Sequence, residues 1–130
     1  MEAYARADGG GADACTCNGC RNFVKVRDRV FPTKFVSFLE SLGIDPHKDG
    51  EVYHNCRLAP SRHDYGGWFH FVGSLDRTGD FVPVDFDGGF TAWLQKRSAP
   101  GLPALENLKL VQLEFHATNV AWALSESEAP

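Results

Sequence analysis

Two periodicities of apolar residues divide the chain. Between residues 31 and 42 the apolar positions recur at intervals of three and four, which is the spacing of one face of a helix. Pro32 suits the first turn of such a helix, and Gly43 suits the left-handed residue that closes it. The pattern therefore predicts a helix over residues 32–42.

The segment just before this helix fits two structures. Phe23, Val26 and Val30 share one helical face, whereas Val24, Val26 and Val30 alternate with charged residues as in a strand. We favour a helix over residues 21–30, with a break at Pro32.

From residue 50 onward the period changes to two. Val52, His54, Cys56 and Leu58 alternate with their neighbours, which predicts a strand over residues 51–58. Further strands are expected over residues 67–75, 81–86, 90–96, 108–116 and 120–124, with short turns at 77–80, 87–89 and 117–119. Hairpin turns join antiparallel strands. The sequence thus predicts an α+β fold, in which one or two N-terminal helices pack on a curved antiparallel sheet of five or six strands.

The two ends of the chain differ in composition from its middle. Three glycines stand among Ala and Asp near the start, so residues 1–13 are expected to form a flexible leader. Residues 126–130 have the same character and are expected to form a flexible tail. Residues 14–125 would then be a single α+β domain, of a size that one hydrophobic core supports.

Cysteines supply the sharpest chemical signal. Three of the four fall within six residues, at Cys15, Cys17 and Cys20. Zinc prefers thiolate or imidazole ligands in a tetrahedral set, and a C-x-x-C turn places two sulfurs on one side of a loop. A fourth ligand is expected from Cys56, or alternatively from His54 on the same face of the predicted strand. The sequence predicts a structural zinc site, although a buried, metal-free Cys56 would also be ordinary.

The same cysteines support a second interpretation, a thiol redox site. Cys17 and Cys20 form a C-x-x-C pair, and a helix beginning near Arg21 would lower the pKa of the first thiol. Redox sites of the thioredoxin type follow a strand, however, whereas this motif follows a glycine-rich segment. A binding protein with structural zinc is our first hypothesis, and thiol redox chemistry is the alternative.

A small-ligand cavity is a further alternative. Alternation places Trp68 and His70 on one face of a strand, and with His54 they could line a cavity. Ordinary core packing would explain the same residues. No spacing identifies a catalytic set, so we expect a binding protein rather than an enzyme, with a protein or a small molecule as its partner.

Charge and composition narrow the class of partner. The formal net charge of -4 argues against binding nucleic acid or an anionic membrane over the whole surface. The basic residues between 21 and 34 are better explained as a solvated helix face. Neither a secretory signal nor a membrane-spanning stretch of about 20 apolar residues is recognised, so a cytoplasmic location is expected.

Several short motifs also carry a resemblance. The segments C-T-C-N-G-C-R-N-F at 15–23, L-G-I-D at 42–45 and Y-G-G-W at 65–68 resemble those of a group of small bacterial proteins of uncharacterised function. The likeness covers residues 15–73 and implies a cytosolic bacterial protein. It implies no activity and no site residue.

Overall fold

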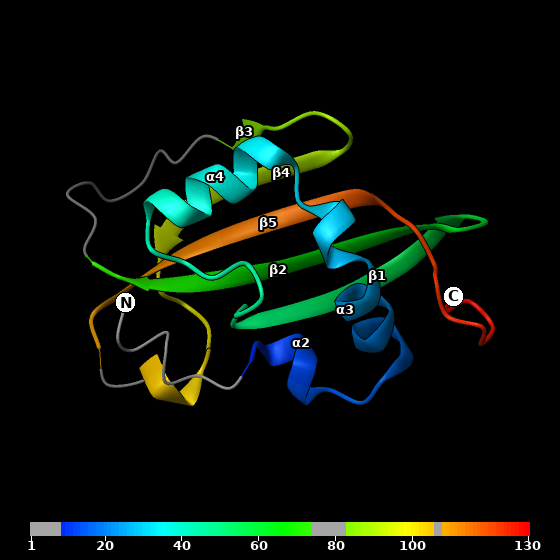
Figure 1. Cartoon of the computed structure of the whole chain (residues 1–130), viewed down its shortest axis with the longest axis horizontal. Coiled ribbons are helices and arrows are strands. Elements are labelled where there is room, and N and C mark those ends of the chain that lie inside the picture. Colours follow the sequence, from blue (N-terminus) through cyan, green and yellow to red (C-terminus); the bar gives the residue numbers. More distant parts are fainter. Residues whose placement is uncertain (1–8, 74–82, 106–107) are drawn as a thin grey trace.

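Helices come first along the chain and strands follow. The computed structural model describes residues 9–73, 83–105 and 108–130. Its elements are α2 (Gly11–Ala14), α3 (Asn18–Val30), α4 (Thr33–Ser41), β1 (Glu51–Ala59), β2 (Arg62–Val72), β3 (Val84–Asp85), β4 (Phe90–Lys96), the 3-10 helix η1 (Pro103–Leu105) and β5 (Leu110–Val120). The strands form one antiparallel sheet in the order β1-β2-β5-β4-β3 (Figure 1). The predicted α+β fold is confirmed.

Helix α3 starts and stops for local reasons. Cys17 caps its first turn, because the Cys17 sulfur accepts a hydrogen bond from the Cys20 backbone N–H at 3.4 Å. The helix ends before Phe31, whose ψ of 117° is extended, since Pro32 disfavours helical geometry in the residue before it. The segment that fitted both a helix and a strand is therefore helical, and the helix begins earlier than predicted, at Asn18.

Helix α4 confirms the helix predicted over residues 32–42. Its end is closed by Gly43, which adopts a φ of 73° that a residue with a side chain rarely takes. The backbone N–H of Ile44 then donates to the Leu39 carbonyl at 2.9 Å. This pattern satisfies a carbonyl group that the helix end would otherwise leave unpaired.

The strands depart from their predicted bounds in the middle of the sheet. β5 is continuous through residues 117–119, where the sequence predicts a turn, because Ala117 pairs with Tyr65 of β2 and with Phe90 of β4. The strand predicted over residues 120–124 is wrong, since residues 121–130 are neither helix nor strand. β2 begins at Arg62 rather than at 67. The predictions for residues 74–75, 77–80 and 81–82 fall outside the described residues.

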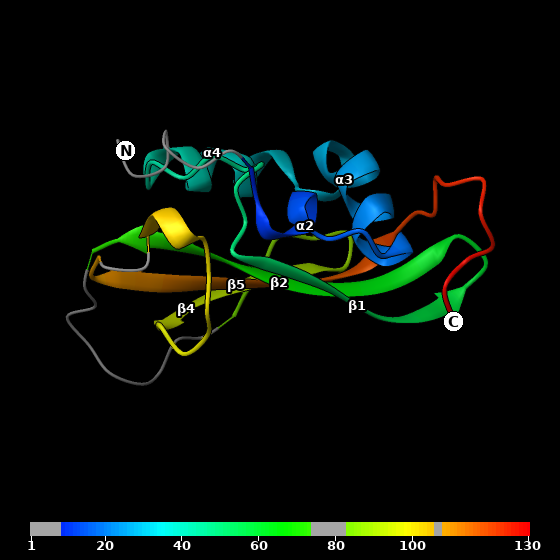
Figure 2. The ribbon, with the colours of Figure 1, turned by 90° about the horizontal axis from the view of Figure 1, so that it is seen from below.

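Aromatic rings fill the space between the helices and the sheet. Phe115, at the middle of β5, is fully buried, and its ring centroid lies 5.3 Å from that of Phe31 and 5.6 Å from that of Phe90. Further rings in the same core belong to Phe23, Phe35, Tyr65 and Phe69. Paired aromatic rings stabilise a core beyond the area that they bury. They fix α3 and α4 on one face of the sheet, and α2 lies on the same face (Figure 2).

The first described residues pack against the domain. Residues 9–13 belong to the expected leader, yet Ala12 is buried and its backbone N–H donates to the Asp49 carboxylate at 3.0 Å. The Asp13 carboxylate forms an ion pair with Arg27 of α3 at 3.0 Å. These contacts tie α2 to the last turn of α3 and to Asp49.

Residues 121–130 lie along α3 and the turn between β1 and β2. The fully buried Asn22 of α3 donates to the Ala121 carbonyl at 2.9 Å and accepts from the Ala123 backbone N–H at 2.7 Å. Farther along, Glu126 forms a bidentate ion pair with Arg21. The expected tail, residues 126–130, thus includes a residue with a specific partner on α3.

Candidate metal centre

Cys15, Cys17 and Cys20 meet in the loop between α2 and α3. Cys15 ends α2, Cys17 caps α3, and Cys20 lies in the first turn of α3. The sulfurs of Cys15 and Cys17 are 3.2 Å apart, and all three sulfurs lie within 4.8 Å of one another. Around a tetrahedral zinc ion with bonds of about 2.3 Å, two sulfurs are separated by about 3.8 Å. The cluster could therefore hold one metal ion after small adjustments.

The three thiols differ in exposure and acidity. Cys17 is exposed, Cys15 is half-buried and Cys20 is buried. A backbone hydrogen bond from Cys17, with further hydrogen bonds from the other two thiols, lowers the pKa of Cys15. Burial raises the pKa of Cys20 far above its ordinary value, and the neighbouring thiols raise it further. The Cys15 thiol therefore loses its proton more easily than an ordinary cysteine does, and the Cys20 thiol less easily.

The sheet holds the buried end of the cluster in place. The Tyr65 hydroxyl of β2 donates to the Gly19 carbonyl at 2.7 Å, and the Cys20 thiol lies 3.9 Å from the Val52 carbonyl of β1. Burial raises the pKa of Tyr65 to about 12, so this hydroxyl keeps its proton at neutral pH. The N-terminus of α3 also carries partial positive charge, which favours thiolates in its first turn.

Neither residue predicted as the fourth ligand joins the cluster. All four cysteines and all five histidines of the chain lie within the described ranges, and of these only Cys15, Cys17 and Cys20 form a group that could share an ion. The His54 Nε2 atom lies 2.8 Å from Nδ1 of His63. The pairing of β1 with β2 is irregular between His54 and Cys56, so strict alternation fails there. Over residues 9–73, 83–105 and 108–130, the cluster therefore has three thiols and no fourth ligand.

The predicted ligand cavity is not assembled either. His54 pairs with Tyr65, which is buried in the core beneath the helices. Trp68 and His70 alternate with Tyr65 along β2 and therefore point to the opposite face of the sheet. His70 is buried there, with Nε2 lying 2.9 Å from the Gln112 side-chain oxygen. The sheet itself separates His54 from the other two residues.

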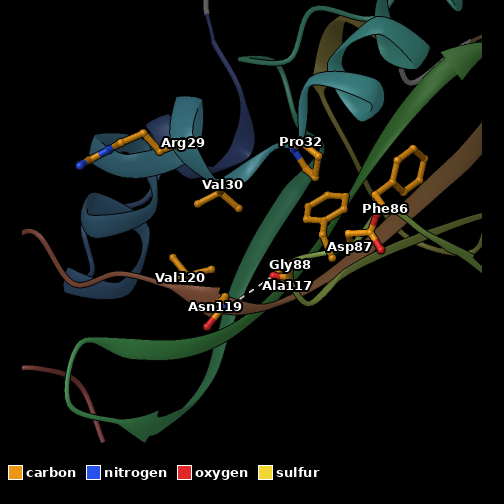
Figure 3. A pocket seen from close by; sticks show the side chains of 10 residues that line it. Arg29, Val30, Pro32, Phe86, Asp87, Gly88, Ala117, Asn119 and Val120 are labelled. Carbon is orange, nitrogen blue, oxygen red and sulfur yellow. Dashed lines mark hydrogen bonds between the residues drawn. The ribbon is translucent and has the colours of Figure 1, made fainter.

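A pocket opens elsewhere, between the α3–α4 corner and the β3–β4 turn (Figure 3). Its volume is about 310 Å³, and its apolar lining includes Val30, Pro32 and Val120. Asn119 at its rim donates to the Gly88 carbonyl at 3.4 Å, while the Arg29 guanidinium extends away from the pocket. The pocket contains none of the residues from which the sequence predicted a cavity.

One residue that supports the cluster, through its hydrogen bond to the Tyr65 hydroxyl, was not recognised from the sequence. Asn22 lies among the apolar positions of α3, next to Phe23 and one turn before Val26. A polar residue on the buried face of a helix implies a hydrogen-bond partner in the core, which is a usable signal. Its partners at Ala121 and Ala123, however, are about a hundred residues away in the chain and have no sequence signature.

Comparisons of the chain with protein-family profiles, with curated proteins and with solved structures find no match. Among the described residues, no helix has the length and apolar character needed to cross a membrane.

Proposed function

We propose that this chain is a zinc-binding protein in which Cys15, Cys17 and Cys20 hold one ion as thiolates. The gathering of their three sulfurs within 4.8 Å, at the N-terminus of α3, is the observation that supports it most strongly. The ion would join the end of α2 to the start of α3 and so help to fix both helices on the sheet. The role that follows is binding of another molecule by the stabilised domain, without catalysis.

Zinc prefers four ligands, and the cluster supplies three. The fourth would be water or a donor from another molecule, on the side where Cys17 is exposed. A complex of three thiolates with one zinc ion carries a single negative charge. The N-terminus of α3 would stabilise that charge, as would Arg21, which is anchored beside the loop by donating to the Thr16 carbonyl at 3.1 Å.

Native mass spectrometry with elemental analysis, on protein purified without chelator or affinity tag, tests this proposal. We expect one zinc per chain and four reduced thiols. Cys17→Ser and Cys20→Ser should lose the ion and melt at a lower temperature, because binding of structural zinc contributes to folding. Cys56→Ser is the matched control, since it removes a thiol outside the cluster.

Two results would reject the proposal. One is a reduced wild-type protein that stays free of zinc after incubation with zinc. The other is loss of the ion in Cys56→Ser while Cys17→Ser retains it, since the ligands would then lie elsewhere.

Thiol redox chemistry is the second candidate. Cys17 is exposed at the cap of α3, whereas Cys20 is buried and its pKa is raised by burial. This is how an attacking thiol and a resolving thiol are arranged. A small-molecule disulfide as oxidant would take up two electrons and the two thiol protons as the Cys17–Cys20 bond forms. A metal-free protein that is lighter by two hydrogens would favour this candidate over zinc binding.

A further inference from the structure

The sheet face opposite the helices carries alternating aromatic and acidic side chains. Helices α2, α3 and α4 all lie on the other face (Figure 2). Trp68 of β2 and Trp93 of β4 are both register partners of Glu114, which lies between them on β5. Paired residues of an antiparallel sheet project from the same face about 5 Å apart. Glu114 is therefore flanked by an indole on each side.

Tyr53 of β1 extends this arrangement. Its register partner is Gly66, and a methyl group placed on Gly66 would lie 2.4 Å from the Tyr53 hydroxyl. The Tyr53 ring therefore occupies the space that a side chain at Gly66 would fill. Its centroid lies 6.0 Å from that of Trp68, and Tyr53 is 39% exposed. We call Tyr53, Trp68, Trp93 and Glu114 the aromatic platform.

Both indole N–H groups of the platform already have acceptors. Trp68 donates to the Pro100 carbonyl at 2.9 Å, and Trp93 donates to the Gln95 side chain at 3.1 Å. These bonds hold the two rings, which are only half-buried. The two indoles therefore offer a ligand their ring faces rather than hydrogen-bond donors.

The platform is also negatively charged. Glu114 accepts a hydrogen bond from the neutral Gln112 side chain at 2.6 Å, and no ion pair joins it to a Lys or Arg within the described ranges. Burial raises the pKa of Tyr53, and the negative charges of Glu114 and Asp64 raise it further. Asp64 itself lies 2.8 Å from Nε2 of His116. The charge of Glu114 is thus left for a cation from outside.

Aromatic faces around a carboxylate favour one class of ligand. A quaternary ammonium group has no N–H to donate, spreads its positive charge over methyl groups and binds to ring faces by cation–π attraction. We propose that the aromatic platform binds a quaternary ammonium group, carried either by a small molecule such as choline or by a trimethyl-lysine side chain. This site lies on the opposite face of the sheet from the cysteine cluster and does not depend on the metal.

Calorimetric titration of the full chain tests the proposal with three probes: choline, a short trimethyl-lysine peptide, and the uncharged carbon isostere of choline. We expect saturable binding of at least one cation, with the isostere at least about ten-fold weaker. Glu114→Gln and Trp93→Leu should each weaken binding about ten-fold. Glu40→Gln removes the same charge from an exposed position on α4 and should leave binding unchanged.

Choline binding without peptide binding identifies a small-molecule ligand, and the reverse identifies a modified peptide; either supports the site. Equal affinity for the isostere, wild-type affinity in a folded Glu114→Gln variant, or no saturable binding of either cation would overturn it. Melting curves establish that each variant is folded, and Tyr53→Leu is a second test at a more exposed position. Cys17→Ser should bind the cation normally, which separates this proposal from zinc binding.

Discussion

Replacing Asn22 by alanine should destabilise the domain more than the loss of a single hydrogen bond at the protein surface would. The Asn22 side chain makes three hydrogen bonds: to the Ala121 carbonyl at 2.9 Å, from the Ala123 N–H at 2.7 Å, and to the Tyr65 hydroxyl at 3.3 Å. Each contributes about 1 kcal/mol net, so their loss lowers the free energy of unfolding by about 3 kcal/mol. For a chain of this length, that corresponds to a fall in melting temperature of about 10 °C.

Equilibrium urea unfolding followed by circular dichroism measures this change directly. Asn55→Ala is the matched control, because Asn55 is exposed and makes one hydrogen bond, to Asp64 at 2.9 Å. A surface substitution of this kind should cost no more than about 0.5 kcal/mol. Limited proteolysis adds a second measurement, since the variant should be cleaved faster between residues 121 and 130.

The reasoning fails if Asn22→Ala unfolds within about 0.5 kcal/mol of the wild type, the range expected for an uninvolved surface position. Residues 121–123 would then not be docked on α3 in solution. Faster cleavage between residues 121 and 130 without a change in the free energy of unfolding would also contradict this prediction. The same three hydrogen bonds should determine both the cleavage rate and the free energy of unfolding.

Three further expectations concern protons and packing. Zinc affinity should fall between about pH 8 and about pH 6 in a chelator competition, because protons compete for the thiolates and burial raises the pKa of Cys20; a flat profile would exclude thiolate ligation. Glu128→Gln should lower the melting temperature near neutral pH but leave it unchanged at about pH 3. The hydrogen bond from His63 lowers the pKa of Glu128, so the ionised carboxylate stabilises the fold at neutral pH, and this stabilisation is lost as the carboxylate becomes protonated. Gly67→Ala should reduce the free energy of unfolding by about 3 kcal/mol in urea, since its methyl group would lie 2.6 Å from a backbone carbonyl and 2.7 Å from the Phe115 ring; an unchanged midpoint would show that β2 can shift.

Local patterns were sufficient for those elements whose ends are set by neighbouring residues. Helix α4 has its proline, its apolar stripe and Gly43 within one segment, and β4 matches its predicted bounds of 90–96. The strand predicted over residues 108–116 matches most of β5, but its continuation through residues 117–120 could not be predicted in the same way. Ala117 and the two polar residues after it have the composition of a turn, but strands on both sides supply hydrogen-bond partners and keep this segment extended.

The same distinction between local and long-range information applies to the candidate metal centre. Cys15, Cys17 and Cys20 are so close in sequence that one loop brings them together, and their spacing alone identified them. The predicted fourth ligand depended on where β1 would lie against α3 and on unbroken alternation past His54. The irregular pairing before Cys56 interrupts that alternation, and no sequence pattern predicts this irregularity.

The contacts between α3 and residues 121–130 set the order in which the domain can be completed during synthesis. Asn22 bonds to partners 99 and 101 residues later in the chain, and Arg21 to one 105 residues later. Contacts over such separations form late and slow folding, because a long loop must be closed before they stabilise anything. A nascent chain whose residues 121–126 are still inside the ribosome can form α3 but leaves Asn22 without its backbone partners, so α3 acquires these contacts only once that segment has emerged.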